Sequence, residues 1–165
     1  MKSRKNKLVI FSALFVSAVV FGSLAYSHCQ IPCGIYDDEA RFNEIAEHIT
    51  TIEKSMKQID ILSAEAKPNM NQIVRWVNNK EAHADELSHI VTYYFMAQRV
   101  KIASEGNIPE YKKYVRKLTL LHEMLVTAMK AKQSTDTDNV AKLRTLLNSF
   151  HDAYTGKVAM SEHKH

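Results

Sequence analysis

The feature that most constrains the fold is the spacing of apolar residues between positions 42 and 154, where they recur at alternating steps of three and four. Such steps keep side chains on one stripe of a helix, so the sequence predicts four amphipathic helices. The four stripes are Phe42, Ile45, Ile49, Ile52, Met56 and Ile59; Met70, Ile73, Val77, Leu87, Val91 and Tyr94; Tyr111, Val115, Leu118, His122, Leu125 and Met129; and Val140, Leu143, Leu147, Phe150 and Tyr154. There is no strand signal.

Helix-breaking residues lie at the expected junctions between these stripes. Pro68 follows the first stripe, Gly106 and Pro109 separate the second from the third, and Gly156 follows the fourth. The polar run 134–139 joins the last two helices and offers several N-caps. Because short connections make consecutive helices antiparallel neighbours, we expect an all-α, up-down-up-down four-helix bundle over residues 37–156, with a tail at 157–165.

Residues 1–27 are typical of a cleavable signal peptide. A basic segment precedes an apolar run from Leu8 to Ala25, and Ala25-Tyr26-Ser27 provides the small residues that signal peptidase requires. The alternative is an uncleaved membrane anchor, since the apolar run is at the lower limit of what spans a bilayer. The small residues favour cleavage, so we expect signal peptidase to release a mature chain that starts at His28 in an exported compartment (periplasmic, extracellular or lumenal), without stable membrane contact.

The charge of the mature chain excludes electrostatic recognition of nucleic acid. The whole chain has 22 basic and 18 acidic residues, but four of the basic ones lie in the signal peptide, at Lys2, Arg4, Lys5 and Lys7. Cleavage therefore leaves 18 of each sign and no net charge. A neutral chain lacks the basic footprint of a nucleic-acid-binding protein or of one that binds an acidic membrane surface.

The nine residues after the cleavage site, which we call the hook, carry metal-binding chemistry. They read His28-Cys29-Gln30-Ile31-Pro32-Cys33-Gly34-Ile35-Tyr36. The free amine of His28 and the backbone nitrogen of Cys29 close one five-membered ring with a metal, and the Cys29 nitrogen and thiolate close a second. Cys33 adds another thiolate if Pro32 and Gly34 turn the chain. The His28 imidazole is left as an axial ligand, and two nitrogens with two thiolates in a plane suit Ni(II) or Cu(II) rather than tetrahedral zinc.

The hook followed by a helical bundle resembles the nickel superoxide dismutase family. This resemblance implies one nickel ion per subunit that cycles between Ni(II) and Ni(III), superoxide as the substrate, O₂ and hydrogen peroxide as products, and a homohexamer. It also implies that the amine and imidazole of His28, the amide and thiolate of Cys29 and the thiolate of Cys33 are the metal ligands. Tyr36 matches the family tyrosine close to the open face of the metal.

The resemblance extends to three residues of the bundle. The family has a glutamate sixteen residues after the first histidine, which holds the axial imidazole, and Glu44 stands at that distance. A family arginine that supports this glutamate maps to Asn79 or Lys80, and we expect Lys80 to supply the positive charge instead. Tyr94 resembles a second family tyrosine near the active site. The chain also has Gln30 where the family often has aspartate.

Two other functions remain open from the sequence. One is an exported nickel- or copper-binding protein that has the same hook but no turnover. The other is a helical interaction module in which Cys29 and Cys33, the two cysteines of the chain, form a disulfide.

The remaining histidines and Trp76 have structural interpretations. We expect His122, which falls on the third stripe, to be a core residue, and Trp76 to take part in packing or in a subunit contact. The other histidines are expected at the surface or its boundary, or in the tail, rather than as ligands: His48, His83, His89, His151, His163 and His165.

Overall fold

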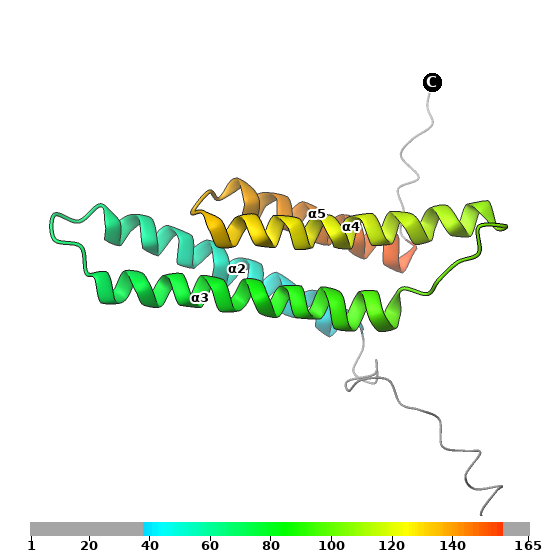
Figure 1. Cartoon of the computed structure of the whole chain (residues 1–165), viewed down its shortest axis with the longest axis horizontal. Coiled ribbons are helices and arrows are strands. Elements are labelled where there is room, and N and C mark those ends of the chain that lie inside the picture. The colour runs from blue at the N-terminus through cyan, green and yellow to red at the C-terminus, as the bar shows by residue number, and fades with distance from the viewer. Residues whose placement is uncertain (1–37, 157–165) are drawn as a thin grey trace, which may run out of the picture. The chain divides into compact units, whose positions relative to one another are not determined.

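The computed structural model describes residues 38–156, which are all-helical and contain no strand (Figure 1). Its helices are α2 (Asp38–Ser63), α3 (Met70–His89), α4 (Ile108–Gln133) and α5 (Asp138–Thr155), and α3 continues into the π-helix η1 (Ile90–Arg99). The expected signal peptide, the hook and the tail lie outside the described residues. None of the described helices is both long enough and apolar enough to span a membrane.

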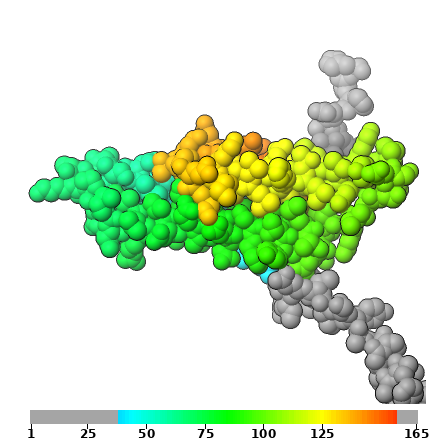
Figure 2. All heavy atoms as spheres, in the orientation of Figure 1, coloured from blue at the N-terminus to red at the C-terminus, as the bar shows by residue number. Residues whose placement is uncertain are grey.

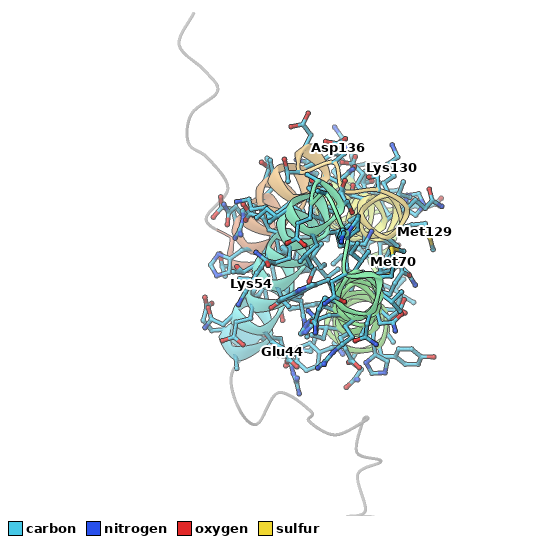
Figure 3. All side chains as sticks on the ribbon, turned by 90° about the vertical axis from the view of Figure 1, so that its left-hand side faces the viewer. Glu44, Lys54, Met70, Met129, Lys130 and Asp136 are labelled. Atoms are coloured by element: carbon cyan, nitrogen blue, oxygen red, sulfur yellow. The ribbon has the colours of Figure 1, made fainter. Side chains whose placement is uncertain are left out.

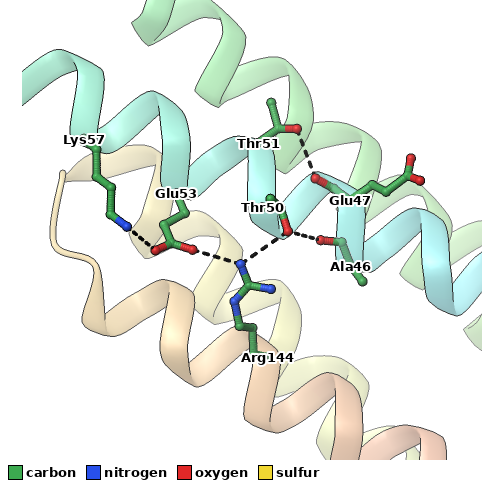
Figure 4. A network of polar contacts seen from close by, with 7 residues as sticks. All are labelled: Ala46, Glu47, Thr50, Thr51, Glu53, Lys57 and Arg144. Carbon is green, nitrogen blue, oxygen red and sulfur yellow. Dashed lines mark hydrogen bonds and ion pairs between the residues drawn. The ribbon is translucent and has the colours of Figure 1, made fainter.

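Neighbouring helices run antiparallel around a closed ring. α2 lies against α3 and α5, and α4 lies against the same two helices. The antiparallel direction follows from paired contacts: Tyr94 reaches Asp38 at one end of the α2–α3 pair, whereas Asn79 donates to Ser55 farther along it. α5 is tied to α2 by Arg144, whose guanidinium donates to Glu53 over 2.9 Å and to the hydroxyl of Thr50 over 3.3 Å (Figure 4). The predicted four-helix arrangement is therefore confirmed for these residues.

The core confirms three of the four predicted stripes in large part. Every residue of the first stripe is buried, as are the second stripe from Leu87 to Tyr94 and the fourth from Val140 to Phe150. The start of the second stripe is wrong, because Met70 is 63% exposed at the beginning of α3. There the α2–α3 hairpin extends beyond the α4–α5 turn, at the left of Figures 1 and 2, so no helix covers it.

The third stripe is wrong in register. α4 buries Leu120, Leu121, Met124, Thr127, Ala128 and Ala131, whereas Val115 and Met129 are 41% and 52% exposed. His122 is also exposed, which corrects its assignment to the core. The end-on view shows Met129 on the outer side of α4 (Figure 3). The buried stripe is offset by about one residue from the predicted one, so Leu118 and Leu125 pack against the core but are only partly buried.

Candidate functional site

The described chain starts two residues after Tyr36, at the end of the bundle to which the hook is connected. Of the predicted site residues, the structure describes Glu44, Lys80 and Tyr94. The predicted ligands His28, Cys29 and Cys33, and also Tyr36, lie outside the described residues. The geometry available is therefore that of the protein groups around the first turns of α2.

Asp38, the first residue of α2, is the centre of a cluster formed with three donors. Tyr94 donates its hydroxyl to Oδ1 of Asp38 over 2.5 Å, and Tyr154 donates to Oδ2 over 2.5 Å. The guanidinium of Arg99 donates to the same Oδ2 over 2.6 Å. We call these four residues the Asp38 cluster. It joins the start of α2 to η1 and to the end of α5, and so fixes the position of the first residue of α2.

The π-helical winding of η1 brings two members of the Asp38 cluster together. In a π-helix the backbone hydrogen bonds join residues five apart, and the amide of Val100 accordingly donates to the carbonyl of Phe95 over 2.8 Å. Side chains five residues apart in sequence then lie on nearly the same face of the helix, as Tyr94 and Arg99 do. In an α-helix the same two residues would point to different sides. π-Helical turns are frequent at functional sites.

The charges of the Asp38 cluster stabilise one another. Burial raises the pKa of Asp38, but the hydrogen bonds from Arg99, Tyr154 and Tyr94 outweigh it, so the pKa lies below its ordinary value. Burial and the hydrogen bond to Asp38 raise the pKa of Tyr94 to about 12. The hydrogen bond to Asp38 also raises the pKa of Arg99. At neutral pH the cluster thus holds one carboxylate, one guanidinium and two neutral phenols.

Arg41 connects Glu44 with Tyr94. Its guanidinium donates to Oε2 of Glu44 on the same face of α2, and it lies 5.4 Å from the centre of the Tyr94 ring. That distance is within the range of a cation–π contact. Two residues predicted from the sequence, Glu44 and Tyr94, are therefore brought to one region through a third that the sequence reasoning did not single out.

Lys80 lies elsewhere and has a different partner. Its side chain is 4% exposed, and its ammonium donates to the carbonyls of Lys132 and Ser134 over 2.7 and 2.8 Å. These are carbonyls at the C-terminus of α4, where a cation satisfies unpaired acceptors and the helix dipole. The structure therefore does not bring Lys80 to Glu44, and Arg41 provides the cation next to that carboxylate. Asn79, on α3, donates its side-chain amide to the hydroxyl of Ser55 on α2.

An aromatic group supports the Asp38 cluster from the core side. The rings of Phe42, Phe95, Phe150 and Tyr154 have neighbouring centroids 4.8–5.7 Å apart. Tilted and edge-to-face pairs at such distances add to the free energy gained from burial. The Asp38 cluster therefore packs against closely spaced aromatic side chains of α2, η1 and α5.

A basic cavity of about 430 Å³ is lined in part by Arg99. Besides Arg99 it is lined by Lys101, Lys113 and Lys117, with Glu110 as its acidic residue. Several like charges around one concave surface raise the local concentration of small ions of the opposite sign. The lining of this cavity therefore carries four cationic side chains and one carboxylate.

Sequence reasoning missed Asp38, Arg41, Arg99 and Tyr154. For Arg41 a signal existed, because it stands one turn before Glu44 on a predicted helix. For Arg99 there was none, since its place depends on the π-helical winding. Within residues 38–156 no group of three or more His, Cys, Asp or Glu side chains is arranged to hold a metal ion.

Comparison with known proteins identifies a family. A family model described as nickel-containing superoxide dismutase matches residues 23–157, which is most of the chain. The match spans the hook and the whole bundle. No curated protein and no solved structure matches the chain.

Proposed function

The chain belongs to the nickel-containing superoxide dismutase family, and on this premise we propose that its nickel is held by the hook, through His28, Cys29 and Cys33. The protein is an enzyme of that family and nickel is its cofactor. The observation that carries the proposal is the order of donors along the hook. An amine, an amide and a thiolate follow one another in His28-Cys29, and a second thiolate comes four residues later.

The donor set fits nickel chemically. Thiolates and imidazole are ligands that suit late first-row transition metals, and the amine and amide of a free N-terminus complete the set. The His28 imidazole would be a further ligand, and Glu44 would hold it in one orientation and tautomer. Arg41 supports this role, because its ion pair keeps the carboxylate of Glu44 fixed on α2.

When bound, nickel would supply a one-electron couple, Ni(II)/Ni(III), for the conversion of superoxide to O₂ and hydrogen peroxide, which consumes two protons. The protein provides the substrate path and the protons. Tyr36 would donate protons through water, and the basic cavity beside Arg99 would raise the concentration of the superoxide anion at this end of the bundle. Tyr94 would remain neutral, because its hydrogen bond to Asp38 keeps its proton in place.

Substitution of His28 tests the proposed site. In His28→Ala the amine, the amide and both thiolates remain, so nickel should stay close to one ion per chain. Activity should fall by at least about tenfold, since even groups that only support a metal ligand are worth ~10–100-fold. Nickel content and superoxide consumption are measured on the same sample. His89→Ala, at an exposed residue of α3, is the control and should keep both. Unchanged activity in His28→Ala would refute the role of the imidazole as a ligand.

The proposed export and cleavage follow from the same chemistry. The amine of His28 exists only after residues 1–27 are removed, so signal peptidase is required to create the site as well as to release the protein. We therefore place the mature enzyme in an exported compartment.

We also propose that the enzyme is a homo-oligomer. The family resemblance implies a hexamer. Large apolar side chains that a monomer leaves exposed support this, notably Met70 and Val74 on the projecting hairpin and Val126 and Met129 on α4. Native mass spectrometry of the nickel-loaded protein should give six chains. The double substitution Val126→Lys and Met129→Lys should lower that number if α4 is in an interface. A wild-type protein that remained monomeric would contradict the proposal.

A further inference from the structure

A histidine pair bridges α2 and α3 away from the Asp38 cluster. Nδ1 of His48 and Nδ1 of His83 are 2.8 Å apart, and the ring centroids are separated by 5.0 Å. Both side chains are partly buried, which confirms their expected place at the surface boundary. Their pairing was not predicted, because the two residues are 35 positions apart and face each other only when the helices pack.

We propose that His48 and His83 form a second metal site, which binds a divalent transition-metal ion such as Zn(II), Ni(II) or Cu(II) between their Nδ1 atoms. Imidazole nitrogen is a good ligand for each of these ions. This site shares no ligand with the hook, so it does not depend on the proposed function of the hook.

The geometry of the pair is close to that of a bound ion. Two nitrogens on one tetrahedral zinc, each about 2.0–2.1 Å from it, lie roughly 3.3 Å apart. In the structure the same nitrogens are 2.8 Å apart, so one of them donates a hydrogen bond to the other. The rings therefore have to part by about half an ångström, which small side-chain rotations provide. When the metal binds, the donor ring changes tautomer, and its proton moves from Nδ1 to Nε2 so that both Nδ1 lone pairs face the ion.

The surroundings favour a cation. Burial and the neighbouring His83 lower the pKa of His48, so its ring is neutral at physiological pH and its lone pair is available. Three carboxylates act in the opposite direction and raise the pKa of His48, namely Glu44, Glu47 and Glu86. They favour positive charge at this place, whether it is a proton or a metal ion. A neutral ring at His48 and three nearby carboxylates therefore suit a divalent cation between the two imidazoles.

The number of ligands limits the affinity. Because residues 38–156 contain no group of three metal-binding side chains, two imidazoles provide the protein ligands and water completes the coordination. Such a site exchanges its metal readily, unlike a site with four protein ligands. His48 lies one helical turn after Glu44 on α2. A metal bound by the pair is therefore close to the carboxylate that we propose orients the His28 imidazole.

Zinc titration tests the second site. The probe is Zn(II) alone, added to the nickel-loaded mature protein and followed by calorimetry. The background variant His163→Gln/His165→Gln removes the tail histidines. One zinc per chain should bind, and the further change His48→Gln/His83→Gln should weaken it by more than about tenfold, because removing a ligand costs more than removing a group that supports one. His89→Gln/His122→Gln, which removes two exposed histidines, should bind zinc as the background does.

Imidazole ¹⁵N NMR spectra of the background protein identify the zinc ligands directly. They do not require His48→Gln/His83→Gln to fold. In the background protein, zinc should shift the Nδ1 signals of two histidines only, and these should be His48 and His83. Zinc binding that is unchanged in His48→Gln/His83→Gln would overturn the proposal. So would zinc that shifts other histidines, or no zinc binding at all in the background protein.

Discussion

A mature protein that retains Ser27 before His28 should lose its nickel and its activity. The added residue converts the α-amine of His28 into a peptide nitrogen and moves the free amine away from Cys29, so the first chelate ring is lost. Loss of a direct ligand should cost more than the ~10–100-fold that removal of a supporting group costs, so we expect activity to drop by more than about a hundredfold. Nickel content, superoxide consumption and the N-terminal sequence are measured on each preparation.

The matched control adds one serine after His165, which leaves the hook intact and should keep full activity. A second control removes the added Ser27 with an aminopeptidase, after which nickel binding and activity should return. An extended protein that consumed superoxide at the rate of the wild type would contradict the role of the amine. Mass spectrometry of the wild type also distinguishes free thiols at Cys29 and Cys33 from the disulfide that an interaction module would contain.

The sequence predicted the helical fold because the signal is repeated and local. On α2 every residue of the predicted stripe is buried, since the other faces of this helix carry mainly polar side chains. α4 is different. It has two apolar faces, and periodicity alone does not say which of them packs on the neighbouring helices. The exposed positions Val115 and Met129 belong to the face that the sequence favoured.

The site could be predicted only where its chemistry is contained in one short segment. The hook gives its donors from nine consecutive residues and one cleavage, so no tertiary structure is needed to infer them. The Asp38 cluster is different, because its members come from α2, η1 and α5. It forms only when three helix ends meet and when η1 winds as a π-helix, which places Tyr94 and Arg99 on one face. Periodicity rules for α-helices do not foresee that placement.

Replacement of Asp38 by asparagine should have the largest effect on stability. The carboxylate is 18% exposed and accepts from Tyr94, Tyr154 and Arg99, and asparagine offers one acceptor atom and no charge. We expect Asp38→Asn to lower the free energy of unfolding by about 2–4 kcal/mol. This is a large share of the ~5–15 kcal/mol that a typical domain has. Chemical denaturation at pH 7 measures the change.

The pH dependence separates the charge of Asp38 from its shape. Its pKa in the folded protein is lowered, so its contribution is fully present above the pKa of an unfolded aspartate, about 3.9, and is lost as the pH falls through the lower folded value. The wild type and Asp38→Asn should therefore differ by a constant amount from pH 5 to 7 and converge below pH 4. Asp152→Asn is the control, because that side chain is 58% exposed and lies 4.0 Å from the imidazole of His151, and it should change stability by less than about 0.5 kcal/mol. In Asp38→Asn the pKa of Tyr94, about 12 in the wild type, should also fall, because the carboxylate that helps to raise it is gone. If Asp38→Asn were as stable as Asp152→Asn at pH 7, the cluster would not anchor the start of α2.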